Sequence, residues 1–308
     1  MEASVRSVLA MAAVFVIAQL GAILMAASVL SPEERVFQNP DDPLIPIYYI
    51  IAIIGFTFAI LFIIKKKRES LVRVVFLGAV VYTIFFVILL VTATFIPGIL
   101  PLLISVGLTA LLAYLLLKKP EWYVVDAAGI IMAIGVIGIL GISLSILPVI
   151  VLLVLLAIYD AVSVYGTRHM VALADGVTEM KLPILLVIPK KRGYSYLDQK
   201  PLREQLDKGE EREAMFMGLG DVIIPGVLVI SAFSYLPEKP IWEVQGALLV
   251  ALGTMVGALI GFAILMRYVM RGKPQAGLPL LNGGAIVGYI VSYLLVYGSL
   301  TFGITSPW

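Results

Sequence analysis

Two aspartates lie inside apolar stretches of the sequence, where an ionised side chain is costly. Asp160 lies six residues before Gly166, close to the end of one apolar segment. Asp221 lies eight residues after Glu213, close to the start of the next apolar segment. An ionised carboxylate inside a bilayer costs roughly 2.5–3.5 kcal/mol even on the lenient insertion scale, so it normally has a function or a partner. Because no Lys or Arg lies near either acid within these segments, we expect the two carboxyl groups to face each other.

A facing pair of buried carboxyl groups has a specific chemistry. Two such groups a few ångströms apart in a low dielectric cannot both ionise, so they share one proton. The ionised group can take a proton from water, while the protonated group donates one to a peptide carbonyl oxygen. This is the chemistry of aspartic proteases, and it needs no metal, thiol or histidine. The chain has no cysteine and one histidine, which excludes cysteine nucleophiles, iron–sulfur clusters and an ordinary zinc site. We therefore expect no metal and no cofactor.

The composition indicates a membrane protein. Hydrophobic residues make up 61% of the 308 residues and charged residues 14%, and the mean hydropathy is +1.06. Soluble domains are about 45–50% apolar and about 25% charged, so this chain has too little charge to cover a surface in water. The lipid bilayer is thus an expected partner. A net charge of +2 gives no reason to expect nucleic acid, and nothing in the sequence indicates an oligomeric state.

Nine apolar segments are long enough to cross a bilayer, since a helix needs about 20 apolar residues to do so. Two pairs of these segments are separated only by short breaks, at 96–98 and at 143–145. We therefore predict an all-α, polytopic membrane protein with nine transmembrane helices at approximately 7–30, 45–64, 71–95, 98–117, 122–142, 145–166, 214–236, 242–268 and 278–302.

The basic residues support this count and give an orientation. With nine spans, all but two of the 22 Lys and Arg residues fall on one side, and only Arg35 and Lys239 fall on the other. Lys and Arg gather on the cytoplasmic side, so we predict a cytoplasmic N-terminus and an extracytoplasmic C-terminus. The first apolar run is longer than the core of a signal peptide, and we expect it to be retained.

The connection at 167–213 differs from the others and divides the chain. It holds nine of the basic residues and a charged run at 207–213 that is typical of a solvated segment. Ahead of that run, the apolar stretch 182–188 is too short for a span, which favours a short β-strand. We therefore predict three parts: helices 1–6 in 1–166, a cytoplasmic loop in 167–213, and helices 7–9 in 214–308.

The surroundings of the aspartates predict how each is used. Gly218 and Gly220 lack side chains, so a backbone can approach Asp221 closely, and Pro225 favours a kink in the same helix. A third acid within a span, Asp126, lies about one turn inside its segment. We expect it to be interfacial and neutralised by a neighbouring lysine at 118 or 119.

Two motifs carry a resemblance to a known family. Tyr159-Asp160 in the sixth span and Gly218-Leu219-Gly220-Asp221 in the seventh resemble the YD and GxGD motifs of presenilins and signal peptide peptidases. The similarity covers the nine spans, the long sixth connection and a proline motif that opens the last span. The family has Pro-Ala-Leu there, whereas this chain has Pro279-Leu280-Leu281, which adds bulk beside the expected position of the acids. The chain looks like a microbial, archaeal-type presenilin homologue.

The resemblance implies an intramembrane aspartyl endopeptidase with transmembrane proteins as substrates. Asp160 and Asp221 would be catalytic, Tyr159 and Gly218-Leu219-Gly220 would support them, and Pro279-Leu280-Leu281 would contact the substrate. It also implies that the predicted loop strand, and Leu185, Leu186 and Val187 in particular, pairs with an unwound substrate strand.

Two other functions fit part of the pattern. A proton-coupled transporter or channel can use a buried aspartate pair as a proton relay, but it predicts inverted repeats, and none is visible in the sequence. An enzyme similar to prepilin peptidases also uses Gly-x-Gly-Asp, although such enzymes have fewer spans and place the first aspartate differently. The protease of the presenilin type is the function we expect.

Overall fold

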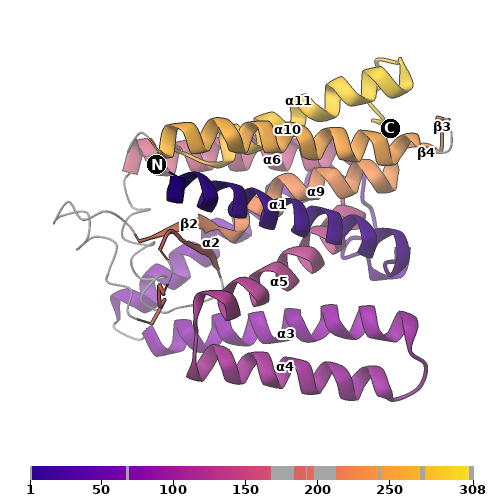
Figure 1. Ribbon diagram of the computed structural model, residues 1–308. Helices are drawn as coiled ribbons and strands as arrows, with labels where there is room; N and C mark the ends of the chain where they lie inside the picture. The colour runs from indigo at the N-terminus through magenta and orange to yellow at the C-terminus, as the bar shows by residue number, and fades with distance from the viewer. Residues whose placement is uncertain are drawn as a thin grey trace. The chain divides into compact units, whose positions relative to one another are not determined.

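The protein is mostly helical (Figure 1). The computed structural model describes residues 2–66, 69–167, 184–191, 193–197, 213–241, 244–270 and 275–304. The helices are α1 (Glu2–Ser28), η1 (Pro32–Glu34), α2 (Ile45–Lys65), α3 (Glu69–Phe95), α4 (Leu100–Lys118), α5 (Trp122–Ser143), α6 (Ile146–Val162), the π-helical turn η2 (Ser163–Thr167), α9 (Leu219–Tyr235), α10 (Gly246–Val269) and α11 (Leu278–Tyr297). Two antiparallel strand pairs join β1 (Leu185–Pro189) to β2 (Ala214–Gly218), and β3 (Pro240–Ile241) to β4 (Val244–Gln245).

Seven helical segments in the described part of the chain are long and apolar enough to cross a membrane. They are Val5–Ser28, Ser70–Phe95, Leu100–Lys118, Trp122–Ser143, Ile146–Tyr165, Gly246–Val269 and Leu278–Tyr297. Two further apolar helical segments, Ile45–Ile60 within α2 and Leu219–Tyr235 (α9), are shorter. The protein is therefore an integral membrane protein with several apolar helices.

The two short breaks in the apolar sequence are helix ends in the structure. α3 ends at Phe95 and α4 begins at Leu100, and Gly98 between them has a φ of +84°, which glycine adopts without steric cost. α5 ends at Ser143 and α6 begins at Ile146. The N–H of Ser145 donates to the carbonyl oxygen of Pro40 at 2.9 Å. This hydrogen bond stabilises the break between α5 and α6.

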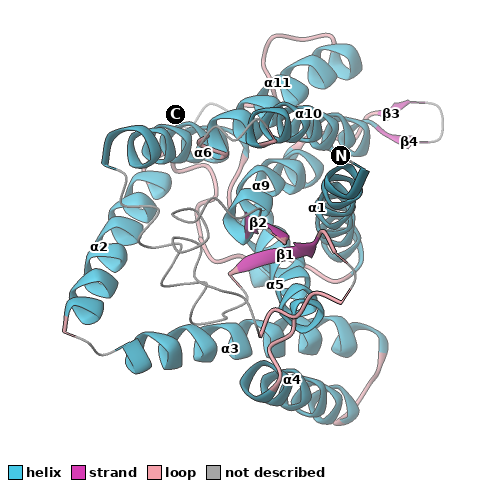
Figure 2. Cartoon of the chain, turned by 60° about the vertical axis from the view of Figure 1, so that its left-hand side comes forward, coloured by secondary structure: helices cyan, strands magenta, loops and turns pink. Residues whose placement is uncertain are grey.

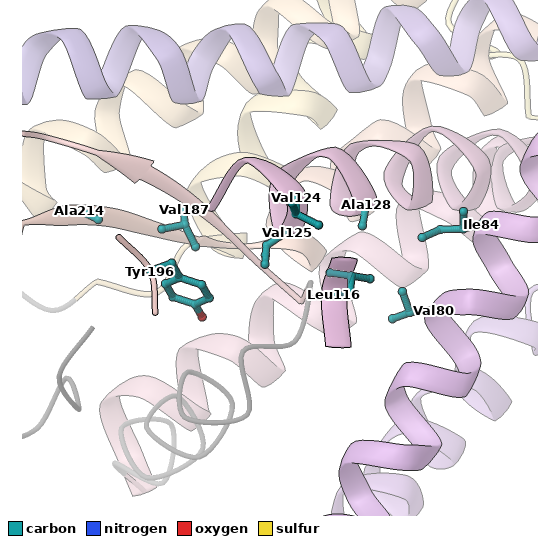
Figure 3. Close-up of a cluster of buried hydrophobic side chains, with 9 residues drawn as sticks. All are labelled: Val80, Ile84, Leu116, Val124, Val125, Ala128, Val187, Tyr196 and Ala214. Atoms are coloured by element: carbon teal, nitrogen blue, oxygen red, sulfur yellow. The ribbon is translucent and has the colours of Figure 1, made fainter. Parts of the chain in front are cut away.

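The chain forms two compact units, each of which takes residues from several parts of the sequence. The first comprises Met1–Ala18, Phe56–Gly135 and Arg168–Gly220. Its apolar core joins α3, α4, α5 and the β1–β2 pair (Figure 3). The buried residues of this core are Val80, Ile84, Leu116, Val124, Val125, Ala128, Val187, Tyr196 and Ala214. The amino-terminal half of α5 thus supports the strand pair.

The second unit comprises Gln19–Gly55, Val136–Thr167 and Asp221–Trp308, and it contains a close helix pair. α10 and α11 pack along their length, and α11 also contacts α6. Glycines spaced by four residues line the contact: a Cβ on Gly257 would collide with the carbonyl oxygen of Gly284, and a Cβ on Gly261 with that of Leu280. Small residues at this spacing let the backbones of membrane helices approach closely. This packing fixes where α11 begins.

The strand pair corrects the predicted start of the seventh span. The sequence predicted a helix from 214, but residues 214–218 form β2, antiparallel to β1 and beside it (Figure 2), with Val187 opposite Phe216. A short apolar run does not distinguish a strand from a helix, and pairing with β1 decides between them. Gly218 therefore ends a strand, and Asp221 lies in the first turn of α9 rather than further inside a helix that starts at 214. Residues 182 and 183 of the predicted loop strand lie outside the described residues.

Candidate functional site

Asp160 is held by the first residue of α11. The side chain lies on the last turn of α6 before the π-helical turn η2 and is 5% exposed. Its Oδ2 accepts a hydrogen bond from the backbone N–H of Leu278 at 3.0 Å. The first N–H groups of a helix have no partner within the helix, so the amino terminus of α11 offers donors to a carboxylate. The backbone of α11 thereby fixes the orientation of Asp160.

Asp221 packs against the residue directly before Leu278. It lies in the first turn of α9, where a Cβ built on Gly277 would come within 3.3 Å of its Oδ2 and 3.4 Å of its Oδ1. The backbone of Gly277 has φ −79° and ψ −50°, which any residue can adopt, so the missing side chain matters for space rather than for conformation. Both carboxyl groups therefore contact one peptide step, Gly277–Leu278, and all of these residues belong to the second unit.

The proline motif forms the first turn of α11. Pro279 takes one of the first two helical positions, where its missing N–H would have no helical partner. Leu281 is fully buried, whereas Leu280 is partly buried and its carbonyl group packs against Gly261. The motif thus follows directly after Gly277 and Leu278, the residues that contact the two aspartates.

The other residues of the two aspartate motifs differ in their exposure and in their contacts. Tyr159 is 38% exposed, on a different face of α6 from the buried Asp160. The N–H of Leu219 continues the strand ladder by donating to the carbonyl oxygen of Ile184 at 2.8 Å. A Cβ on Gly220 would have no atom within 4 Å, so the position next to Asp221 is open.

Sequence reasoning missed several residues around the aspartates. Gly277 and Leu278 contact the two acids, and Tyr165 accepts a hydrogen bond from the N–H of Ala276 at 3.4 Å. One turn further along α11, the Nδ2 of Asn282 donates to the carbonyl oxygen of Leu153 on α6 at 2.9 Å. A glycine two residues before Pro279 and a single amide in an apolar helix were the available signals, and neither indicates a partner without the fold.

Asp126 corrects a second prediction. It is 6% exposed, and where a lysine partner was predicted its Oδ1 accepts a hydrogen bond from the backbone N–H of Val187 in β1 at 2.7 Å. Burial, and secondarily the negative charge of Asp126, raises the pKa of the nearby Tyr196 to about 12. The partner of Asp126 is therefore the strand β1, which composition and spacing alone did not indicate, because β1 lies 61 residues away in the sequence.

The residues that the structure describes contain no group of three or more His, Cys, Asp or Glu side chains that could hold a metal ion. The features that they do contain are several apolar helices and two acids, Asp160 buried and Asp221 partly buried, at the Gly277–Leu278 peptide that begins α11. These features define a class: a helical membrane protein whose carboxyl pair is suited to acid–base hydrolysis.

Comparison with known proteins assigns the family. The family described as "Signal-peptide peptidase, presenilin aspartyl protease" matches residues 12–297. A crystal structure of a presenilin family intramembrane aspartate protease in space group C222 is similar with a TM-score of 0.67 and 32% identity, over 94% of this chain and 99% of that one. A second structure with the same description, in space group P2, gives 0.64 and 30% over 93% and 97%. No match was found among curated proteins.

This chain belongs to the signal-peptide peptidase and presenilin family of aspartyl proteases. Its fold is presenilin-like, and it is an aspartic-type endopeptidase that acts on transmembrane substrates in the bilayer. The reading as a proton-coupled transporter is not favoured.

Proposed function

We propose that Asp160 and Asp221 are the catalytic pair of this protease. The observation that carries the proposal is their convergence on the Gly277–Leu278 step, one through a hydrogen bond and the other through packing. One carboxyl group takes a proton from the attacking water, while the other donates a proton to the carbonyl oxygen of the scissile peptide. The tetrahedral intermediate then collapses as the leaving nitrogen takes up a proton from the pair. No metal or other cofactor enters these steps.

The substrate must unwind before it can react. A transmembrane helix hides its carbonyl groups in hydrogen bonds to residues four positions away, so a segment around the scissile bond has to become extended. An extended segment can add to an existing strand pair through backbone hydrogen bonds. Within the first unit, the β1–β2 pair, which contains Leu185, Leu186 and Val187, offers such a template. The chain leads from β2 directly through Gly220, where space is open, to Asp221.

Nine membrane crossings are the arrangement we infer for the whole chain. Seven helices meet the length of a full span, and the shorter helices Ile45–Ile60 and Leu219–Tyr235 would complete the nine. At a rise of 1.5 Å per residue, the 17 residues of α9 are about 26 Å long, close to the thickness of a hydrocarbon core. With this count the basic residues gather on one face, which places the N-terminus in the cytoplasm and the C-terminus outside.

This orientation predicts where the substrate is cut. Asp160 lies in the last turn of α6 before η2, and Asp221 lies in the first turn of α9. Both helix ends face the cytoplasm in the nine-span arrangement. We therefore expect cleavage inside the substrate span, toward its cytoplasmic end.

The pH dependence of the rate tests the shared proton. Only the singly protonated pair has both an acid and a base, so the rate should rise and then fall with pH as a bell. A second proton removes the base on the acidic side, and loss of the shared proton removes the acid on the basic side. The measurement is kcat for a single-span substrate from pH 4 to 9, with helix content followed by circular dichroism as the control for unfolding. A flat profile over a pH range in which the fold is intact would exclude the shared-proton mechanism.

A further inference from the structure

The two outer edges of the β1–β2 pair differ in which side chains cover them. The alternating pattern of hydrogen bonds between the strands shows which backbone N–H and C=O groups face outward. The N–H of Leu219 donates to Ile184, and the N–H of Lys190 donates to Glu213, both at 2.8 Å. In an antiparallel pair, directly bonded positions alternate with positions whose N–H and C=O groups point away from the partner. The register then turns the backbone groups of Leu185, Val187 and Pro189 away from β2.

Side chains from two helices pair with two of the outward groups on this edge of β1, the N–H of Val187 and the carbonyl oxygen of Pro189. The carboxylate of Asp126 on α5 accepts from the N–H of Val187 at 2.7 Å. Pro189 has no N–H, and its carbonyl oxygen accepts from the hydroxyl of Ser7 on α1 at 3.1 Å. Asp126 and Ser7 are both buried. An incoming strand could bond at this edge only by displacing a buried carboxylate from its donor, which would leave that carboxylate unpaired.

The outer edge of β2 is different. By the same alternation, Ala214, Phe216 and Gly218 turn their N–H and C=O groups away from β1. Phe216 and Gly218 are partly exposed, and no hydrogen bond from the described residues reaches these outward groups. Gly218 also lies only three residues before Asp221 in the chain. An unpaired strand edge is a template for a further strand.

We propose that Asp126 is a positioning residue that closes the outer edge of β1, so that an unwound substrate strand can add only to the outer edge of β2. The inference rests on the proposed strand addition and names the residue that selects its edge. A carboxylate suits this role because it only accepts hydrogen bonds, and a buried one in a membrane protein needs a fixed donor. A substrate on β2 enters next to the segment that leads to Asp221, whereas a substrate on β1 would be bound without being cut.

Cross-linking measures the edge directly, because the chain has no cysteine of its own. In an Asp160→Asn background, which traps substrate, one cysteine is introduced as Phe216→Cys or as Leu185→Cys. Each protein is oxidised with a substrate that carries a single cysteine near its cut site. We expect the Phe216→Cys protein to give at least about ten times more cross-link, because the edge of β1 is reached only by unpairing Asp126. In these proteins Asp126 is still present. Equal cross-linking yields at the two positions would therefore overturn its proposed role.

Substitution of Asp126 completes the test. Asp126→Leu removes the acceptor and frees the N–H of Val187, so cross-linking through Leu185→Cys should rise to about the level of Phe216→Cys. Asp126→Asn keeps an acceptor oxygen and should keep the preference for Phe216→Cys. If both edges bind substrate equally in Asp126→Leu, half of the enzyme–substrate complexes are unproductive. Both kcat and KM should then fall about twofold, and kcat/KM should stay constant. A fall in kcat/KM with no new cross-link at Leu185→Cys would show a merely structural role.

The experiments distinguish a failure of the proposed strand addition from a failure of the proposed role of Asp126. If the wild-type protein cuts the substrate but neither cysteine cross-links to it, strand addition itself is wrong, and the edge selection falls with it. If Phe216→Cys cross-links and the preference is the same in Asp126→Leu as in the parent, strand addition stands and the role of Asp126 is overturned.

Discussion

Replacing Asp160 or Asp221 by asparagine is expected to lower cleavage of a single-span substrate by about 10³-fold or more. Asparagine neither takes up a proton from water nor donates one to the substrate as an acid, so the pair loses its function when either member is changed. The double variant should be no worse than either single variant, because the two groups act as one unit. Initial rates of purified protein in liposomes give the three values.

The matched control for this result is Asp41→Asn, the same chemical change in the connection between η1 and α2. It should cleave at the wild-type rate, and circular dichroism should show the same helix content in all variants. Asparagine has nearly the same shape as aspartate and no charge to desolvate at the buried position 160 or the partly buried position 221, so we expect Asp160→Asn and Asp221→Asn to fold. A single variant that kept activity within about tenfold of wild type would contradict the assignment of the pair.

A side chain at residue 277 is expected to lower turnover as well, by less than the loss of an aspartate. Because a Cβ there would lie 3.3 Å from the Oδ2 of Asp221, alanine forces the carboxylate to move by a few tenths of an ångström and valine forces it further. Misplacement of a reacting group by about 1 Å can cost 10²-fold, so we expect kcat to fall about tenfold for Gly277→Ala and about 100-fold for Gly277→Val. KM should change little, since the substrate strand binds elsewhere. Steady-state kinetics on the purified variants separate the two constants.

Gly283 provides the control within the same helix. A Cβ there would meet no atom within 4 Å, so Gly283→Ala should retain wild-type kcat. Wild-type turnover by Gly277→Val would mean that residue 277 does not confine Asp221, and the convergence of both acids on the start of α11 would lose its functional meaning.

Part of this fold could be predicted from the sequence, because it depends on the residue types within each segment. The breaks at 96–98 and 143–145 were predicted because glycine, proline and serine interrupt otherwise continuous apolar runs, and the structure ends helices at both places. The family was recognisable because an acid inside an apolar helix is rare, and two acids on consecutive apolar segments are a strong constraint. Composition also sufficed to predict a membrane protein.

Interactions between distant parts of the chain could not be predicted from the sequence. Residues 214–218 were predicted as helix because they continue an apolar run, but the partner that makes them a strand ends 25 positions before Ala214, at Pro189. Asp126 was predicted to be neutralised by one of two lysines near it in sequence, whereas its partner is the N–H of Val187. Gly277 resembles any glycine ahead of a proline until the fold places Asp221 against it. In each case the deciding contact links segments far apart in the chain.

Mass spectrometry of the cleavage products tests most directly whether Asp160 and Asp221 cut peptide bonds within the membrane. The purified chain in liposomes is incubated with a single-span substrate, and the masses of both fragments locate the cut. We predict one set of complementary fragments whose new ends lie inside the span, in its cytoplasmic half, from the wild type and from Asp41→Asn. Neither Asp160→Asn nor Asp221→Asn should produce them. Fragments that end in the flanking segments outside the span, or the same fragments from the double variant, would contradict the account.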